Sequence, residues 1–479
     1  MSTMDTEEAE IHELDAWALA DEIRSGARKA TEVVAHHLER IERLDPALSS
    51  FVFLDQEAAY KRAGEIDQLV EKGVDPGPLA GVPLGIKELH AVEGWPLTSA
   101  SVYFADKVAA RTSTMVARAI EAGAVPIGLT ASPELGRASY CASRLHGVTN
   151  NPWNTERTPG GSSGGSTAAV VAGLVPLATA SDGAGSIRIP ASFCGLVGFK
   201  PTFGLISRGP STVNSGNSTA NGVVSRGVRD TARYLDCVVG VDERDAASLP
   251  SPGFRFEDRI DEVDLHGVRF LWSENLGFAP CNPEVARVTR EAAESLLRAI
   301  DGVLVDAPLS LGDLSSIFNS LTAVDMRNQI RNADYGDLEN LDPTIRRYVQ
   351  PELTVDDVAQ AHVQRGRLVE DLADAFLQAD FILTPATQTT AFAAAGPMPS
   401  DINGIPVSWL NSIGLTYAFN LSGHPAISVP AGLIDGLPIG LQIVGRRHDD
   451  LRVLALAAVL ERVRPWHKLA PYSRSMDRV

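Results

Sequence analysis

Apolar residues recur at helical spacing through much of the first 75 residues. Between residues 31 and 44 they return every three or four positions, so they share one face of a helix. We expect Thr31 to cap this helix and Pro46 to end it. Residues 1–75 are therefore predicted to form a helical cover. The apolar face carries Val34, Leu38 and Ile41.

The pattern changes near residue 79, where short apolar runs begin to alternate with helical periods. Such alternation is typical of an α/β sheet that is covered by helices on both faces. The expected strands are residues 82–86, 125–129 and 175–179, and the expected helices are residues 114–122 and 166–174.

Charge and helical periodicity increase again after residue 230. Residues 283–300 and 355–377 follow good helical patterns. We interpret the whole of residues 231–375 as a helical elaboration over a substrate cleft.

Strand patterns return in the last hundred residues, at residues 381–384 and again between residues 426 and 442. Residues 376–479 are therefore expected to complete the core sheet. The sequence has no internal repeat and no long linker, so it predicts one large α/β domain that both ends of the chain help to build.

The composition narrows the possible partners. The 60 acidic residues outnumber the 42 basic ones in a chain of 479 residues, and 44% of the residues are hydrophobic. An acidic surface disfavours general binding to nucleic acids or to anionic membranes. The four cysteines are too widely spaced for a zinc or redox motif, so no metal is expected. They are Cys141, Cys194, Cys237 and Cys281.

The first residues of the chain suggest no signal peptide, and no segment is expected to span a membrane. Residues 1–8 are acidic and lack the apolar region of a signal peptide, and no run of about 18 apolar residues could span a membrane. We expect a cytoplasmic protein that is a monomer or a homodimer.

Two short loops are rich in glycine and serine: residues 159–166 (Pro-Gly-Gly-Ser-Ser-Gly-Gly-Ser) and residues 181–190 (Ser-Asp-Gly-Ala-Gly-Ser-Ile-Arg-Ile-Pro). Strongly patterned segments border both loops, which disfavours flexible linkers. Neither has the lysine of a phosphate-binding loop. Residues 161–165 match the G-x-S-x-G elbow, but coil precedes them where that elbow needs a strand.

A nucleophile and oxyanion site explains the second loop better. Backbone N–H groups of small residues can turn inward together and stabilise the oxyanion of a tetrahedral intermediate. We expect Gly183, Ala184 and Gly185 to supply these donors and Ser186 to attack the acyl carbon. The first loop offers a second hydroxyl.

Together with residues 81–88 (Gly-Val-Pro-Leu-Gly-Ile-Lys-Glu), these loops resemble the amidase signature family. The resemblance implies a Ser–cis-Ser–Lys triad, with Ser186 as nucleophile, Ser162 as the cis-peptide serine and Lys87 as base. Ser186 follows Ser162 by 24 residues and Lys87 by 99, as in the family. Residues 76–230 would form the core with the triad. Further matches are residues 151–153, 381–385, 419–426 and 436–442.

The resemblance also implies a mixed twisted sheet. It implies a reaction that needs no cofactor. The chain departs from the family pattern at Glu88, where aspartate is more common, and at Ala184, where glycine is more common. Residues 128–134 match loosely. An apolar strand before Lys87 could bury its amine, and burial would lower the pKa of that amine enough to make it a base.

Other residues are assigned supporting or binding roles. We expect Ser163 to form structural hydrogen bonds, and Asp182 and Arg188 to pair and hold the second loop. Gly136 could offer its carbonyl oxygen to the leaving N–H group. Five larger residues could line the substrate pocket, although core packing would also explain each of them: Trp95, Tyr140, Trp409, Ile413 and Tyr417.

The leading hypothesis is a serine hydrolase that cleaves amide-type C–N bonds of small molecules through an acyl-enzyme on Ser186. The same machinery could cleave carbamates or esters. The alternative is the glutaminase-like subunit of a tRNA-dependent amidotransferase, which would need partner subunits. A non-catalytic binding protein is disfavoured because Lys87, Ser162 and Ser186 are all present.

Overall fold

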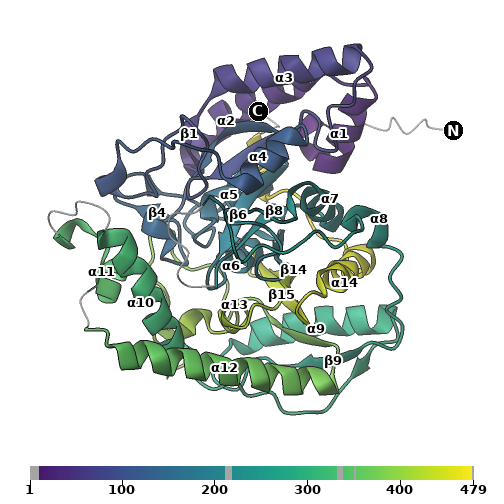
Figure 1. Ribbon diagram of the computed structural model, residues 1–479. Helices are drawn as coiled ribbons and strands as arrows, with labels where there is room; N and C mark the ends of the chain where they lie inside the picture. Colours follow the sequence, from purple (N-terminus) through teal and green to yellow (C-terminus); the bar gives the residue numbers. More distant parts are fainter. Residues whose placement is uncertain (1–9, 211–217, 332–337, 350–351, 477–479) are drawn as a thin grey trace.

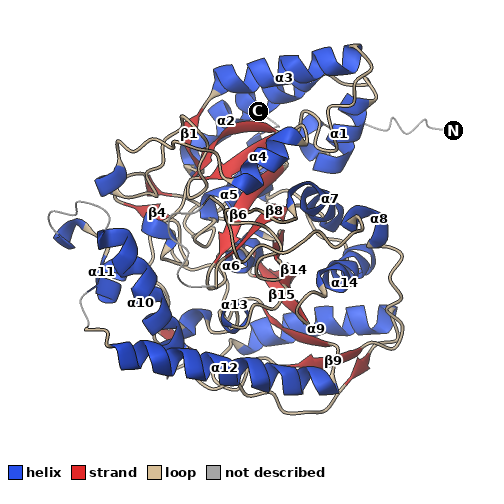
Figure 2. Ribbon diagram, in the orientation of Figure 1, coloured by secondary structure: helices blue, strands red, loops and turns tan. Residues whose placement is uncertain are grey.

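An eleven-stranded mixed sheet runs through the whole molecule (Figures 1 and 2). The computed structural model describes residues 10–210, 218–331, 338–349 and 352–476. In spatial order the strands are β1 (Phe51–Leu54), β3 (Val125–Thr130), β2 (Pro83–Lys87), β6 (Leu177–Asp182), β8 (Ala220–Ser225), β7 (Val197–Lys200), β14 (Ala426–Ile434), β15 (Leu437–Gly445), β11 (Phe381–Pro385), β9 (Arg269–Trp272) and β10 (Val303–Leu304).

The sheet contains both parallel and antiparallel pairs. Strand β2 runs parallel to both of its neighbours, β3 and β6. The next strands, from β6 across to β11, pair antiparallel, and β11, β9 and β10 are parallel again. The predicted single α/β domain with a mixed sheet is therefore confirmed. Two small hairpins, β4 (Ala142–Ser143) with β5 (Gly147–Val148) and β12 (Asp401–Ile402) with β13 (Ile405–Pro406), lie outside it.

Neighbouring strand residues point to opposite faces and join different apolar clusters. Leu177 and Ile427 pack on one face, whereas Ala178 and Ala426 pack on the other. The first face is covered by α4 (Thr114–Glu121), α7 (Val228–Val238), α9 (Pro283–Ala299) and α14 (Asp450–Val463). The second is covered by α2 (Ala30–Leu48), α3 (Gln56–Glu71), α5 (Gly164–Val171), α6 (Arg188–Cys194), α10 (Ser315–Arg331), α12 (Val355–Gln378) and α13 (Ala418–Leu421).

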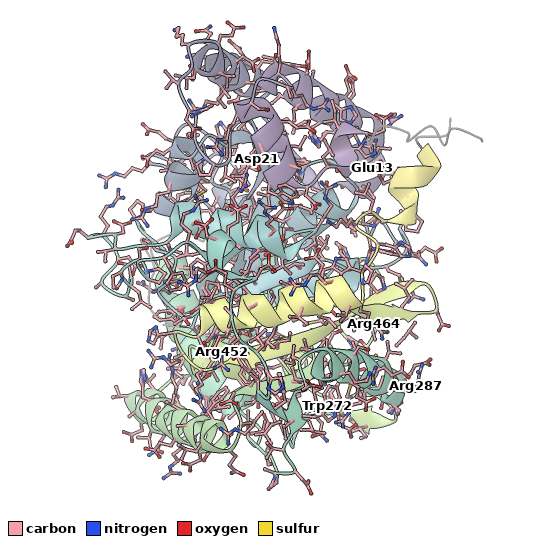
Figure 3. All side chains as sticks on the ribbon, turned by 90° about the vertical axis from the view of Figure 1, so that its right-hand side faces the viewer. Glu13, Asp21, Trp272, Arg287, Arg452 and Arg464 are labelled. Carbon is pink, nitrogen blue, oxygen red and sulfur yellow. The ribbon has the colours of Figure 1, made fainter. Side chains whose placement is uncertain are left out.

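Helices α9 and α14 lie on the part of the sheet that the C-terminal half of the chain builds. Figure 3 shows α14 crossing the molecule with Arg452 and Arg464 near its two ends, and α9 beside it with Arg287 on its outer side. Both helices contribute buried apolar residues to the cluster that lies on β14 and β15. Helix α14 thus comes from the C-terminal part of the chain that was expected to complete the core.

The N-terminal segment differs from the prediction in three details. It contains α1 (Ala16–Arg24), α2 and α3, but β1 interrupts the helices and forms one edge of the sheet. The prediction for Thr31 was wrong: Lys29 precedes the first turn of α2, and the Thr31 hydroxyl donates to Asp67 at 2.7 Å. Pro46 does not end α2, which continues to Leu48.

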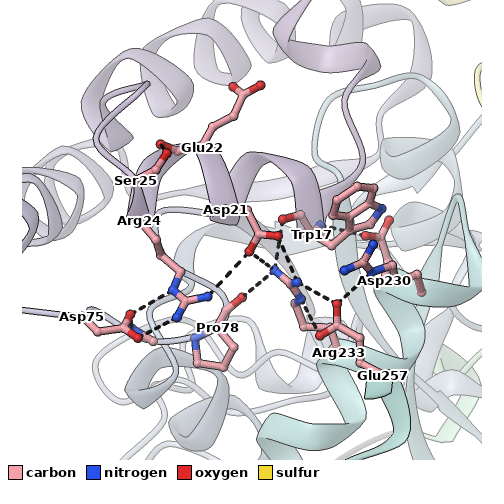
Figure 4. A network of polar contacts seen from close by, with 12 residues as sticks. Trp17, Asp21, Glu22, Arg24, Ser25, Asp75, Pro78, Asp230, Arg233 and Glu257 are labelled. Carbon is pink, nitrogen blue, oxygen red and sulfur yellow. Dashed lines mark hydrogen bonds and ion pairs between the residues drawn. The ribbon is translucent and has the colours of Figure 1, made fainter. Parts of the chain in front are cut away.

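Arg233 on α7 ties the N-terminal helices to the rest of the domain (Figure 4). Its guanidinium donates to Asp21 on α1 at 2.7 Å and to Glu257 on α8 (Phe256–Arg259) at 2.6 Å. The Arg233 and Glu257 side chains are 6% and 5% exposed, so this pair is shielded from solvent. The pair that reaches the N-terminal cover is Arg233 with Asp21, whose side chain is 40% exposed, so the cover is held by a partly exposed ion pair as well as by apolar packing.

The middle of the chain also adds strands, which the prediction missed. Helices α9 and α12 confirm the predicted helices at residues 283–300 and 355–377. Strands β9 and β10 lie in the same segment and extend the sheet at its other edge. Helix α11 (Pro343–Val349) packs with α10 beside the β4 hairpin (Figure 1). The remaining helix is α15 (Pro471–Met476).

Candidate active site

Lys87 is the last residue of β2, and its side chain is fully buried. The Nζ amine donates to three serine hydroxyls: Ser162 Oγ at 2.8 Å, Ser163 Oγ at 2.9 Å and Ser181 Oγ at 3.1 Å. Burial lowers the pKa of Lys87 to about 7, while the charges of Asp182 and Glu88 act in the opposite direction. The predicted burial of this lysine is therefore confirmed, and near neutral pH much of it is an uncharged amine.

The first glycine- and serine-rich loop brings Ser162 to this amine. The peptide bond between Gly161 and Ser162 is cis, as the family resemblance implies. A Cβ atom at Gly161 would lie 2.5 Å from the Ala138 carbonyl oxygen and 2.7 Å from that of Tyr140, so a side chain does not fit there. The chain then enters α5 at Gly164. Glycine thus allows the loop to pass close to residues 138–140.

The second loop follows β6, and α6 follows it (Figure 2). Ser186 is partly exposed, as are Gly183 and Ala184, although most of their neighbours are buried. The Ser163 N–H group donates to the Ser186 carbonyl oxygen at 3.3 Å. This bond joins the two loops directly. The structure therefore brings Lys87, Ser162 and Ser186 into one site, and leaves Ser186 accessible.

The expected oxyanion donors need one correction. The Gly185 N–H group donates to Asp182 Oδ1 at 2.6 Å, so a carboxylate already occupies this donor. Gly185 therefore holds the loop and does not face a substrate. Gly183 and Ala184 remain candidates for the oxyanion hole because both lie on the accessible part of the loop.

Asp182 and Arg188 form the buried pair that the sequence predicted. Arg188 Nε donates to Asp182 Oδ2 at 2.9 Å, and both side chains are fully buried. Burial alone would raise the pKa of Asp182, but the Arg188 charge and hydrogen bonds outweigh burial and lower it below its ordinary value. The carboxylate also accepts from the N–H groups of Gly185 and Ile187. The pair therefore fixes the backbone on both sides of Ser186.

Several partners of these residues were missed. Ser181 contacts Lys87 through both its hydroxyl and its carbonyl oxygen. Thr416 Oγ1 donates to the Ala184 carbonyl oxygen at 2.6 Å. Asn420 and Gln442 accept from Arg188 at 2.6 Å each. Thr416, Asn420 and Gln442 come from C-terminal segments that are distant in sequence, so spacing near the loop gives no signal for them.

The structure divides the expected pocket residues into two groups. Trp95 lies in the core against Phe53, with its Nε1–H donated to Asp55 at 3.0 Å, which corrects its assignment to the pocket. Tyr417 is also fully buried, and its ring packs against Phe278 and Phe318. Core packing is thus the better explanation for both.

The other expected binding residues remain candidates for the pocket. A Cβ atom at Gly136, in the 3₁₀ turn η3 (Glu134–Gly136), would be 3.3 Å from Ser162 Oγ. Tyr140 and Trp409 are partly exposed. The Arg347 guanidinium lies 3.5 Å from the centre of the Trp409 ring. Ile413 is mostly buried and its carbonyl accepts from Thr416 Oγ1. Their contact with a substrate stays a prediction.

Metal-binding clusters and membrane-spanning helices are not found in the described ranges. No group of three or more His, Cys, Asp or Glu side chains in them is arranged to hold a metal ion. No helix in this part of the chain has both the length and the apolar character to cross a membrane.

The geometry agrees with comparisons to known proteins. Residues 32–454 match the family model for amidases. The chain is 34% identical over 480 residues to an acylamidase of Rhodococcus erythropolis, covering 97% of this chain and 98% of that protein. It is 33% identical to a glutamyl-tRNA(Gln) amidotransferase subunit of Dechloromonas aromatica, with 92% and 95% covered.

Solved structures are also similar. A bacterial aryl acylamidase of the amidase signature enzymes superposes with a TM-score of 0.89 and 29% sequence identity, covering 97% of this chain and 98% of that one. Residues 32–454, which the family model matches, include the strand that carries the lysine and both serine loops. This chain therefore belongs to the amidase signature family.

Proposed function

We propose that the chain hydrolyses the C–N bond of small carboxylic amides, with Ser186 as nucleophile and Ser162 and Lys87 as the proton relay. The observation that carries the proposal is the contact between Lys87 Nζ and Ser162 Oγ, at 2.8 Å, in a site where burial lowers the pKa of Lys87 to about 7. A serine hydroxyl is a weak nucleophile until a base takes its proton. A buried neutral amine is such a base.

In the first half-reaction Lys87 takes the proton of Ser162, and Ser162 takes the proton of Ser186. Ser186 Oγ then forms a bond to the carbonyl carbon, and the carbonyl electron pair moves onto oxygen. The N–H groups of Gly183 and Ala184 are the donors for this oxyanion. The proton returns through Ser162 to the leaving nitrogen, the C–N bond breaks, and an ester on Ser186 remains.

In the second half-reaction a water molecule takes the place of the amine. The same relay removes a proton from the water, whose oxygen attacks the ester carbon. Ser186 leaves with that proton, and the carboxylic acid is released. Gly136 lies next to Ser162, so its carbonyl can accept the N–H group of the leaving amine in the first half. No step needs a metal or an organic cofactor.

The substrate class is a non-peptide amide. The relatives named as an acylamidase and an aryl acylamidase support acyl amides and anilides as first candidates. Carbamates and esters present the same carbonyl carbon to Ser186 and form a similar oxyanion, so cleavage of both is compatible with the same residues.

A second candidate function follows from the amidotransferase relative. That protein is a subunit of an enzyme named for transfer to glutamyl-tRNA(Gln), and it is nearly as similar to this chain as the acylamidase. A glutaminase subunit depends on partner subunits. Hydrolysis of a simple amide by the purified chain alone would exclude this alternative.

The deciding experiment is a hydrolysis panel on the purified protein. The panel contains aliphatic amides, anilides, dipeptide amides, carbamates and esters, each tested with wild type and Ser186→Ala. We expect wild type to cleave amides, and Ser186→Ala to lose that activity by several orders of magnitude. Wild-type activity in Ser186→Ala would refute the proposal. If the wild-type protein cleaved carbamates but no amides, the proposed activity would be that of a urethanase.

A further inference from the structure

Glu88 follows Lys87 directly, and both oxygens of its buried carboxylate are hydrogen-bonded. Its side chain is 1% exposed. One oxygen accepts from the Ser132 N–H at 2.7 Å and the Ser132 hydroxyl at 3.1 Å. The other accepts from Thr98 Oγ1, the Ala100 N–H and His146 Nε2, each at 3.1 Å. A carboxylate acts only as an acceptor, and here five contacts occupy it.

The five donors come from three separate segments. Thr98 and Ala100 precede a 3₁₀ turn at residues 102–104, Ser132 precedes η3, and His146 lies in the turn between β4 and β5. Glu134 in η3 also accepts from Ser101 Oγ at 2.6 Å, which ties the first two segments together again. Glu88 is therefore the common anchor of the loops around the end of β2.

The segment that contains Ser132 lies next to the loop that carries Ser162. Ser132 lies shortly before Gly136, whose Cβ position is next to Ser162 Oγ. On the other side, the backbone of β2 fixes Lys87. The Lys87 N–H donates to Thr179 Oγ1 at 2.9 Å, and the Glu88 N–H donates to the Thr130 carbonyl at 3.1 Å. Glu88 thus connects the strand that carries the lysine with the segment that borders Ser162.

We infer that Glu88 is a positioning residue, which holds Lys87 and the η3 segment in register around Ser162. The inference rests on the proposed amide hydrolysis, because it assigns Glu88 a task in that reaction. Glu88 itself touches no reacting atom. Its effect is transmitted through Lys87 on one side and through Ser132 on the other.

The charge of Glu88 gives this role a distinctive signature. Asp182 and Glu88 are the two carboxylates that raise the pKa of Lys87 against the effect of burial. The nearby Cys141 thiol is neutral near pH 7 because burial raises its pKa to about 12, and His90 is neutral because burial lowers its pKa to about 3. Removal of the Glu88 charge should therefore lower the pKa of Lys87 further.

The test compares Glu88→Gln and Glu88→Asp with wild type, on an amide that wild type hydrolyses. The matched control is Glu134→Gln, which changes a second buried glutamate in the adjoining loop that does not act on the pKa of Lys87. The measurements are kcat and KM at plateau pH, the acid limb of the kcat/KM profile, and the melting temperature. Folding of each variant is checked by circular dichroism.

For Glu88→Gln we expect kcat to fall roughly tenfold or more, since a misplacement of about 1 Å can cost about 100-fold and Glu88 acts on the catalytic groups through other residues. We also expect the acid limb to move to lower pH. Glu88→Asp keeps the charge on a shorter side chain, so its kcat should fall while its acid limb stays at the wild-type position. Glu134→Gln should leave the acid limb in place. If Glu88→Gln does not fold, the Glu88→Asp result decides.

Three outcomes would overturn the inference. Glu88→Gln could keep both the plateau and the acid limb of wild type. Glu134→Gln could produce the same shift of the acid limb as Glu88→Gln. Glu88→Asp could match wild type in kcat when Glu88→Gln does not fold. In all three cases the proposed hydrolysis would stand, whereas a wild-type protein that cleaves no amide would overturn both.

Discussion

The Nζ atom of Lys87 lies 2.8 Å from the Oγ atom of Ser162, inside a site that excludes solvent from the amine. No histidine takes part in this contact, so in the proposed relay Lys87 is the base and Ser162 carries the proton. A lysine with an ordinary pKa near 10.4 would be charged at neutral pH and could not accept a proton. Burial is therefore what makes the contact chemically useful.

The pH dependence of activity follows from this contact. The pKa of Lys87 is lowered to about 7, and only the unprotonated amine is a base. We expect kcat/KM for an amide to rise with pH through about pH 7 and then to level off. The measurement is a kcat/KM profile from about pH 5 to 9, which reports ionisations of the free enzyme. A flat profile across this range would show that Lys87 is not the base.

Substitution of the lysine gives a related test. Lys87→Ala removes the proton acceptor and should reduce amide hydrolysis at pH 7 by roughly 100- to 10,000-fold, the usual range for general base catalysis. Lys468, a partly exposed lysine that pairs with Asp15, offers a control for loss of a positive charge. Lys468→Ala should retain activity. Wild-type rates in Lys87→Ala would refute the relay.

The close packing at Gly161 predicts sensitivity to a single methyl group. Gly161→Ala would place a Cβ atom 2.5 Å from the Ala138 carbonyl oxygen, so the loop that carries Ser162 must move. We expect kcat to fall by roughly 100-fold, since small displacements of a catalytic group have effects of this size. Gly64→Ala, in α3, where a Cβ meets no atom within 4 Å and φ is not positive, is the control for a glycine outside the site. Equal rates in the two variants would contradict this assignment.

Substitution within the buried Asp182–Arg188 pair is expected to reduce both the stability and the activity of the protein. Asp182→Asn leaves the Arg188 guanidinium without its carboxylate in a site that water does not reach. Loss of one partner of a buried pair typically destabilises a protein by about 3 kcal/mol or more. Urea unfolding measures this change, and kcat should fall as well because the asparagine amide keeps one acceptor oxygen, so either the Gly185 or the Ile187 N–H group loses its acceptor. An unchanged free energy of unfolding together with an unchanged kcat would show that the pair is dispensable.

A second buried pair predicts how acid affects the fold. Burial alone would raise the pKa of Glu257, but hydrogen bonds from Arg233 and Arg229 outweigh it and lower the pKa below its ordinary value of 4.5. A lowered pKa stabilises the fold above about pH 4.5, and this contribution is lost as the pH falls through the folded-state value. Arg233→Met should lower the melting temperature at pH 7 and weaken its fall between about pH 5 and pH 3. If the melting temperature falls equally between pH 5 and pH 3 in wild type and in Arg233→Met, the Arg233–Glu257 pair is not the source of this pH dependence.

The sequence predicted the parts of this site that lie close together along the chain. Glycines at residues 160, 161, 183 and 185 mark loops that only small residues can build, and the apolar strand before Lys87 indicates burial. Other parts depend on tertiary contacts. Thr416 reaches Ala184 across 232 residues, whereas the Gly185 N–H binds Asp182 only three residues earlier, a local contact that the prediction missed. Trp95 was named as a possible pocket residue because a sequence does not show whether a ring in a loop packs into the core or lines a cavity.

The same limit explains the errors in the fold. Strand β1 has only four residues between two long helices, so its pattern is too short to distinguish from a helix end. Strand β10 has two residues, both exposed, and carries no apolar alternation at all. Their positions are fixed by pairing with β3 and β9, which are distant in sequence.

The most direct test of the central claim is the identity of the acylated residue. The protein would be mixed with an activated aryl ester or anilide, quenched in acid within the first turnover, and digested for mass spectrometry. We predict one acyl group on the peptide that contains Ser186, and no labelled protein with Ser186→Ala. An acyl group on another residue, or the same labelling of Ser186→Ala, would contradict the assignment of Ser186 as the nucleophile.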